Sequence, residues 1–399
     1  MHRVAVALLL AACGGLAACS GPPALARSAA VPAPSTDVSR IIVTPTETAS
    51  LDEIFAAGHQ AAARGDYRQA ATYFDRVAKL EPGGTLAPEA LFLAGEAHDV
   101  LHEHAAALDR YEAVVDHFPR HARAPEAATR GVRLSLYEED WAWAGRFADR
   151  ALERATELGA LQQIVVYAGK ALESVNRGDD VRASGFVERG RNVVEQRGLD
   201  LAGRLPIELA SLYYALGEVR RLRAERIHFD GSETFAARME ARCQFILDAQ
   251  SAYSDSWRAY DPHWSLLSGV RVGELYDNLH RELMTTMKPP ASADTDDRRL
   301  LYYGATRLLY SVLLEKAHGM LDHTLRMAER EHEKSPWVDR ARATLTGIKE
   351  AEQAEADSLA HLPYTRAELE EALTRIRADL RGKAANPRGT TPSAPPAPR

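Results

Sequence analysis

Three histidines in the first half of the chain have a spacing that could bind a metal ion. His98 and His102 lie four residues apart in a segment with helical periodicity, and Asp99 and His104 are close by. Two histidines at positions i and i+4 share one face of a helix, where both can reach the same ion. The alternative is that His98 and His104 are half-buried packing residues and that Glu103 is solvated. We favour packing, so the sequence predicts no metal site.

Sequence motifs that would support catalysis are absent. The chain contains no His-Glu-x-x-His pair, no phosphate-binding Gly-x-x-x-x-Gly-Lys loop, no Gly-x-Gly-x-x-Gly and no Gly-x-Ser-x-Gly elbow. The acidic residues Glu138, Glu139 and Asp140 lie beside a predicted turn, where carboxylates usually cap helix ends or face solvent. The sequence therefore predicts a protein that is not an enzyme and has no cofactor.

The composition favours helices. Of the 399 residues, 26 % are charged, 46 % are hydrophobic and only 7 % are aromatic, whereas alanine, leucine, arginine and glutamate recur throughout. The formal net charge of −7 argues against a nucleic-acid partner, because binding to phosphates needs a basic surface. The densest positive run contains Arg220, Arg221, Arg223 and Arg226. It could contact lipid headgroups or an acidic partner, but we interpret it as one solvated helix face.

The first twenty residues predict export from the cytoplasm. Arg3 precedes an apolar stretch from Val4 to Ala12 that is too short to span a bilayer, and small residues follow. The motif Leu-Ala-Ala-Cys ending at Cys19 resembles the lipobox at which bacterial lipoprotein signals are cut and the new N-terminal cysteine is acylated. The same motif also ends at Cys13, but cleavage there would leave a signal of only 12 residues.

We therefore predict a signal peptide at residues 1–18, a lipid anchor on Cys19 and a tether rich in Pro, Ala and Ser over residues 19–50. Ser20 follows the cysteine, and the resemblance to lipoproteins then implies the periplasmic face of the outer membrane. Cys243 lies in an apolar helical context, which predicts a buried and inert thiol.

Residues 51–200 contain an internal repeat. Its first copy consists of Ile54, Gly58, Gly65, Tyr67, Ala70, Phe74, Val77 and Pro82. The pattern returns after 37 residues as Leu91, Gly95, Ala107, Tyr111, Val114 and Pro119. Two weaker copies follow around Trp141 and Arg177. The pattern resembles the tetratricopeptide repeat (TPR), in which small residues let two antiparallel helices approach closely.

Residues 201–382 keep the helical period without the repeat. Helices are predicted at residues 206–227, 235–260, 264–286, 300–333, 337–356 and 365–380, with a loop over residues 289–297. The last helix is amphipathic and either caps the array or binds a partner. The expected fold class is all-α, a TPR α-solenoid of antiparallel helix hairpins that continues into irregular helical hairpins. Residues 383–399 are predicted to form a disordered tail.

Motifs in the second half resemble a family of periplasmic TPR lipoproteins from gliding and predatory Gram-negative bacteria. The segments that carry the resemblance are Ala249–Tyr253, Asp261–Trp264, Gly269–Tyr276, Leu314–Ala317 and Ser335–Val338. Some members of the family accompany envelope motility or Tol-like machinery, so the resemblance implies a scaffolding role in the periplasm. The loop after Pro290 departs from the longer acidic insert that is typical of the family.

The repeat register also predicts a binding groove on the first helices of the repeats. The side chains expected to face this concave groove are Phe55, His59, Phe92, Glu96, Asp99, Arg133, Tyr137 and Asn176. Aromatic residues beside charges suit a peptide-binding surface, although these aromatics could equally be packing residues. The paired Lys and Asn residues of a carboxylate clamp are missing from these helices, which disfavours capture of a free peptide C-terminus.

The sequence thus predicts a scaffold or adaptor lipoprotein that binds envelope proteins of motility, division or assembly machinery. One alternative is a component of an outer-membrane-protein assembly factor. A second is an enzyme, which would need a deep polar pocket near Trp257, His263 and Trp264 in the C-terminal half.

Overall fold

The computed structural model describes residues 49–201, 204–229, 235–291 and 293–385, with side chains up to Arg375. The predicted signal peptide at residues 1–18, the lipidated Cys19 and nearly all of the tether lie outside the described residues. In the C-terminal region, a helix continues to Ala385 and so enters the first residues of the tail predicted at 383–399.

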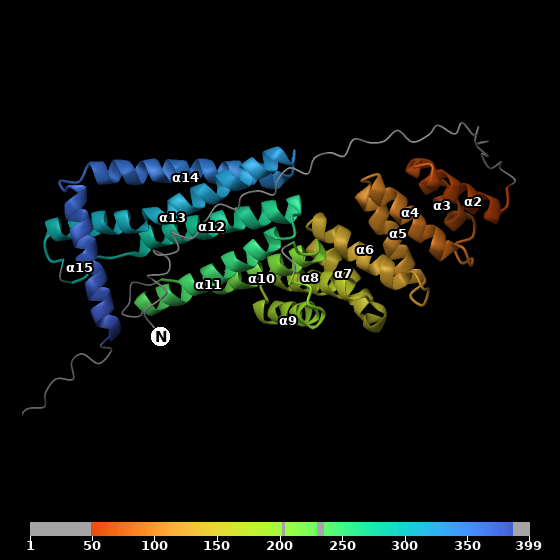
Figure 1. Ribbon diagram of the computed structural model, residues 1–399, viewed down its shortest axis with the longest axis horizontal. Coiled ribbons are helices and arrows are strands. Elements are labelled where there is room, and N and C mark those ends of the chain that lie inside the picture. The colour runs from red at the N-terminus through yellow and green to blue at the C-terminus, as the bar shows by residue number, and fades with distance from the viewer. Residues whose placement is uncertain (1–48, 202–203, 230–234, 292, 386–399) are drawn as a thin grey trace, which may run out of the picture. The chain divides into compact units, whose positions relative to one another are not determined.

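Contacts between Cα atoms divide the chain into two compact units, one ending at Asp200 and the other beginning at Leu201. All regular structure in the described residues is helical, without a strand. The N-terminal unit (Figure 1, red to yellow-green) contains α2 (Leu51–Ala63), α3 (Tyr67–Leu80), α4 (Ala87–Val100), α5 (His104–His117), α6 (Ala124–Tyr137), α7 (Trp141–Leu152), η2 (Ala155–Glu157), α8 (Ala160–Asn176) and α9 (Asp180–Arg197). Consecutive helices pack as hairpins, as the repeat predicts.

Each hairpin of the N-terminal unit turns through one residue in the left-handed conformation. These residues are Gly65, His102, Glu139 and Gly178, with φ values of 79°, 57°, 57° and 73°. The amide after each of them bonds to a carbonyl in the last turn of the preceding helix, which is the Schellman pattern. In three of the four hairpins the next residue is aspartate, and its side chain caps the second helix.

Glycines let the helices of the first three hairpins approach closely. A Cβ atom on Gly58 would lie 2.6 Å from the Phe74 ring, and one on Gly95 would lie 2.6 Å from the Tyr111 ring. Gly131 has the same relation to Phe147, at 2.5 Å. In each case the aromatic residue follows the glycine by 16 positions and is almost fully buried. The repeat signature is therefore a packing signature, in which a glycine on the first helix receives a ring from the second.

The C-terminal unit consists of longer helices. They are α10 (Glu208–Glu225), α11 (Phe235–Trp257), α12 (Pro262–Thr286), α13 (Asp296–Arg330), α14 (Pro336–Ala360) and α15 (Arg366–Ala385). Helix α13 begins four residues before the predicted Leu300, inside the predicted loop, because Thr295 caps it by accepting from the Arg298 amide. Cys243 is buried and forms no disulfide with any residue that the structure describes, and burial raises the pKa of its thiol to about 12, so it is inert near neutral pH.

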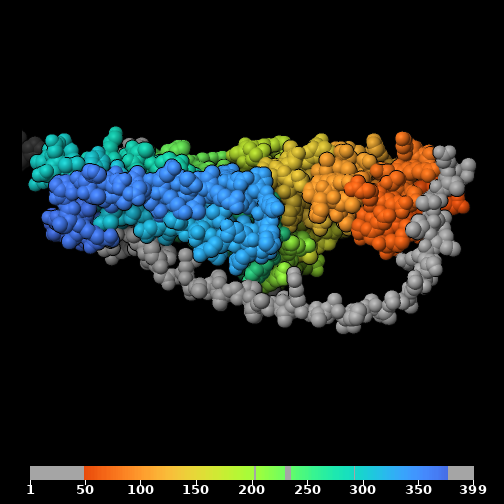
Figure 2. All heavy atoms as spheres, turned by 90° about the horizontal axis from the view of Figure 1, so that it is seen from above, coloured from red at the N-terminus to blue at the C-terminus, as the bar shows by residue number. Residues whose placement is uncertain are grey.

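The amphipathic helix α15 packs within its own unit. Leu369, Ala372 and Leu373 are buried, and α15 contacts α13. Gly304 of α13 makes room for the Leu369 side chain, since a Cβ atom there would lie 2.8 Å from it. In the face seen in Figure 2, the blue side chains of α14 and α15 form a closed surface without a deep opening. The described apolar side chains of α15 therefore pack within the unit, and the helix caps the array.

Candidate interaction site

The first helices of the four hairpins, α2, α4, α6 and α8, carry all eight residues of the predicted groove. We call their shared surface the helix-A face. The structure joins three of these residues through ion pairs between α4 and α6. Glu96 lies 2.7 Å from Arg130, and Asp99 lies 3.5 Å from Arg133. Burial raises the pKa of Glu96, and the Arg130 charge opposes that shift. Paired and partly buried charges of both signs therefore lie at the middle of the face.

Phe92 is not an exposed groove residue, so its assignment to the groove is wrong. It has no exposed surface and packs in a tilted contact with Tyr111 at 6.0 Å between ring centroids. The guanidinium groups of Arg123 and Arg130 lie 4.6 Å and 5.3 Å from the centre of its ring. Two arginines that also bind acidic residues of α4 therefore cover Phe92, and a partner could reach only these arginines.

Phe55 and His59 form an aromatic cluster on α2. Their rings meet edge-to-face at 4.7 Å, and both rings contact Phe74 of α3. Phe55 is half-buried and His59 is exposed. Tyr137 at the end of α6 is also half-buried, and Asn176 at the end of α8 is exposed. The face thus presents both apolar ring surface and hydrogen-bonding groups.

Ion pairs between acidic and arginine side chains also connect successive hairpins. They recur at a regular spacing that the sequence analysis does not use. In each pair the acid belongs to one hairpin, and the arginine follows it by 34 or 35 residues in the next. The pairs are Asp75–Arg110 at 2.6 Å, Glu89–Arg123 at 2.8 Å, Glu96–Arg130 at 2.7 Å, Asp99–Arg133 at 3.5 Å, Glu112–Arg146 at 3.7 Å and Asp116–Arg150 at 2.9 Å. The recurrence of acid and arginine at this spacing is visible in the sequence and could have predicted these contacts.

The histidines with metal-like spacing have other partners. His98 Nδ1 lies 2.7 Å from Glu103, and its Nε2 lies 3.4 Å from Asp75. Glu103, which we expected to be solvated, therefore contacts His98 and also pairs with Arg68 at 3.3 Å. His104 pairs with Glu138 of the next hairpin. Among the described residues, no three His, Cys, Asp or Glu side chains form a group that could hold a metal ion.

The arginine run of α10 is not one solvated face. Arg221 is mostly buried and binds Glu218 and Glu225, and Arg220 binds Asp248 of α11 at 2.8 Å. The periodicity of α10 does not predict this burial. Neighbouring helices surround α10, so its apolar and polar residues do not separate onto two distinct faces.

Glu218 is the centre of a buried charge network in the C-terminal unit. It is only 3 % exposed, and its carboxylate lies 2.8 Å from Arg221 and 3.0 Å from Arg271 of α12. Tyr253 of α11 donates a hydrogen bond to it at 2.6 Å. Burial acts to raise the pKa of Glu218, but the charges of Arg271 and Arg221 outweigh it, and the pKa is lowered. The carboxylate is therefore ionised and holds three helices together.

The region proposed for the enzyme alternative is packed. Trp264 is buried against Tyr214 with 5.2 Å between ring centroids, and Trp257 stacks on His323 at 5.3 Å. The hollow beside His323 is an open groove along α13, with Arg326, Glu329 and Arg330 as its other lining residues. The described residues show no deep polar pocket at this place, so we do not propose the enzyme function.

The solved structures to which the chain is similar include the following two. A tetratricopeptide repeat protein from Parabacteroides merdae is 10 % identical, with a TM-score of 0.39 over 75 % of this chain and 98 % of that one. A human IFIT1 dimer with m7Gppp-AAAA is 12 % identical, with a TM-score of 0.27 over 84 % of this chain and 92 % of that one. The likeness is too low to carry an argument. No family model matches the sequence, and a search of curated proteins finds no relative.

The chain has an all-α fold with TPR-type hairpins. None of the described helices is long and apolar enough to cross a bilayer.

Proposed function

We propose that this protein is a non-enzymatic scaffold or adaptor lipoprotein of the bacterial envelope, anchored through Cys19 to the outer membrane and facing the periplasm. Its TPR-type unit binds an envelope protein through the helix-A face. The observation that carries the proposal is the solenoid of hairpins, because stacked helix pairs bury one continuous core and leave an extended surface for partners.

The chemistry of the helix-A face supports a protein partner. His59, Arg133 and Asn176 are exposed, and Phe55 and Tyr137 are half-buried. Aromatic side chains supply binding area with little loss of conformational entropy, and charged neighbours orient the partner. Because the acidic and basic groups alternate and are already paired, the face suits a polar segment with charges of both signs rather than a strongly acidic or basic one.

The anchor is tested by replacing Cys19 with serine. Without the thiol no acyl chain can be attached, so the variant should leave the outer-membrane fraction and appear in the soluble periplasmic fraction. The measurement is immunoblotting of fractions from cells that produce wild-type or Cys19→Ser protein. Cys13→Ser is the matched control and should stay with the membrane. Equal membrane association of all three proteins would contradict the lipid anchor.

A further inference from the structure

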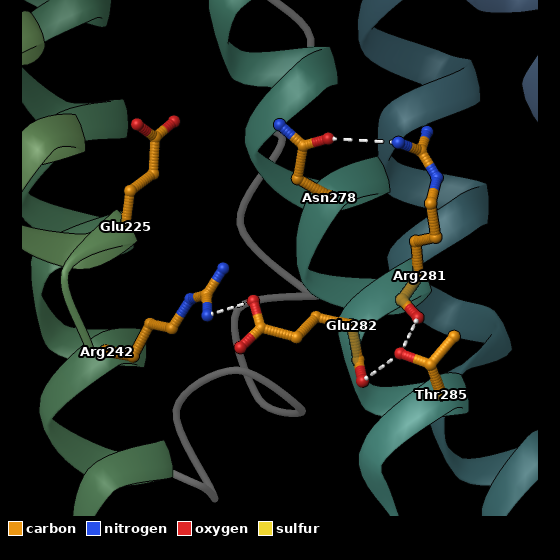
Figure 3. Close-up of a pocket in the computed structure, with 6 residues that line it drawn as sticks. All are labelled: Glu225, Arg242, Asn278, Arg281, Glu282 and Thr285. Atoms are coloured by element: carbon orange, nitrogen blue, oxygen red, sulfur yellow. Dashed lines mark hydrogen bonds and ion pairs between the residues drawn. The ribbon is translucent and has the colours of Figure 1, made fainter. Parts of the chain in front are cut away.

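An open hollow with polar and charged lining residues lies between α10, α11 and α12 of the C-terminal unit. Its volume is about 430 Å³. Its lining residues are Glu225, Arg242, Asn278, Arg281, Glu282 and Thr285. In Figure 3 the Arg242 side chain reaches from the left toward α12, where it meets Glu282, and the amide nitrogen of Asn278 points to the same side of α12. None of these residues belongs to the helix-A face.

Arg242 is the unusual group in this hollow because it is charged and almost completely buried. Its side chain is 5 % exposed. Its Nη1 group donates to the Glu282 carboxylate and, at 3.0 Å, to the carbonyl of Ile227. The guanidinium Cζ lies over the ring of Phe229, 5.0 Å from its centre. The Nε atom is buried and has no hydrogen-bond partner among the residues that the structure describes. Leaving such a donor without a partner is costly inside a protein.

The unfilled donor lies on a particular edge of the guanidinium. Nε and Nη2 form the side-on edge, whose two parallel N–H groups match the two oxygens of a carboxylate. Figure 3 shows no interaction from this edge to the other lining residues. The bonds to Glu282 and Ile227 both come from Nη1, so Nε and Nη2 are the groups of Arg242 left for a further acceptor among the described residues.

The neighbouring charges decide which anion fits. Glu225 and Glu282 also line the hollow, and they balance the formal charges of Arg242 and Arg281. Glu225 is held by Arg221 at 2.7 Å, and Glu282 accepts from the Phe229 amide at 3.2 Å. A dianionic phosphate would be repelled by them more strongly than a monoanion.

We propose that this hollow binds a carboxylate group, held in a bidentate manner by the Nε and Nη2 groups of Arg242 and assisted at the rim by the Asn278 amide. The ligand is either a small carboxylic acid or a glutamate or aspartate side chain of a bound peptide. The proposal concerns the C-terminal unit alone and does not depend on the function proposed for the helix-A face.

The test is the NMR signal of the arginine Nε–H groups in the full chain, with the Arg242 signal assigned by its loss in Arg242→Lys. Titration with acetate should shift the Arg242 signal in a saturable way, with a Kd on the order of millimolar. Chloride at equal ionic strength should not shift it. The exposed Arg298 is the internal control, because its side chain is 63 % exposed and pairs with Asp294 on the surface.

Two further experiments identify the ligand and separate a loss of binding from a loss of folding. In the first, the chain is titrated with a peptide that contains glutamate and with the analogue that contains glutamine. If only the glutamate peptide shifts the Arg242 signal, and does so at lower concentration than acetate, the ligand is a peptide. If acetate shifts the signal and neither peptide does, the ligand is a small acid. Asn278→Ala changes an exposed residue and should weaken acetate binding by about threefold with an unchanged circular dichroism spectrum. The proposal is overturned if acetate shifts the Arg242 signal no more than the Arg298 signal. It is also overturned if phosphate shifts the Arg242 signal at lower concentration than acetate.

Discussion

Replacing Gly95 with alanine should destabilise the N-terminal unit by up to about 2 kcal/mol. Alanine is normally better than glycine inside a helix by about 1 kcal/mol. At this position the added methyl group would lie 2.6 Å from the buried ring of Tyr111, and overpacking of a well-packed core costs about 1–3 kcal/mol. The ring has no exposed surface, so it cannot move aside without disturbing α4 and α5. The free energy of local unfolding is measured by amide hydrogen exchange in these helices.

The matched control is the same substitution at Gly185 of α9. Apart from its chain neighbours and its own helix backbone, no atom of the described residues lies within 4 Å of a Cβ atom there, and the residue is exposed. Gly185→Ala should therefore stabilise its helix by about 0.5–1 kcal/mol. Opposite signs for two identical substitutions in one unit would follow only from the close approach at Gly95. If Gly95→Ala is neutral or stabilising, the glycine–aromatic packing does not explain the repeat.

Replacing Glu218 with alanine should destabilise the C-terminal unit by about 3–5 kcal/mol. The substitution leaves Arg221 and Arg271 facing each other in a buried site without their shared counter-ion, and breaking one partner of a buried ion pair has this order of cost. It also removes the acceptor of the Tyr253 hydroxyl. The free energy of unfolding of α10 to α12, measured by hydrogen exchange, gives the effect. Asp339→Ala is the control, because that carboxylate is 83 % exposed and should change stability by about 0.5 kcal/mol at most.

The same carboxylate predicts a pH dependence. The pKa of Glu218 is lower in the folded protein than its ordinary value of 4.5. The stabilisation from its ionised form is therefore complete above pH 4.5 and is lost as the pH falls through the folded pKa. In Glu218→Gln this contribution is missing, so the unfolding free energy of that variant should fall less below pH 4.5 than that of the wild type. Parallel curves for the two proteins would show that Glu218 is not held as an ion in the folded state.

The hairpins of the N-terminal unit could be predicted from local sequence because their signals are short-range and repeated. Gly58 with Phe74, and Gly95 with Tyr111, place a small residue and a ring at a fixed distance along the chain. The left-handed turn residue followed by a capping aspartate is equally local. His102 and Glu139 take the same conformation without being glycine, so residue type at this position alone does not predict the turn.

The positions of the charged side chains could not be predicted from the period of a single helix. Glu218 is buried by residues 35 and 53 positions later, Tyr253 and Arg271, and α10 itself gives no sign of this contact. The repeat register gives the direction of the Phe92 side chain, but it does not show which side chains cover that ring. Arg123 and Arg130 cover its ring, and they come from the following hairpin.

The measurement that tests the central claim most directly is site-specific photocrosslinking in living cells. A photoreactive phenylalanine analogue is introduced at position 133 or 137 on the helix-A face, or at position 188 on α9 as a control, where the natural Glu188 is also exposed. The scaffold function predicts that one envelope protein is crosslinked from positions 133 and 137 and not from position 188, with Cys19 intact. Crosslinks that are equal at all three positions, or that occur at none, would contradict binding through the helix-A face.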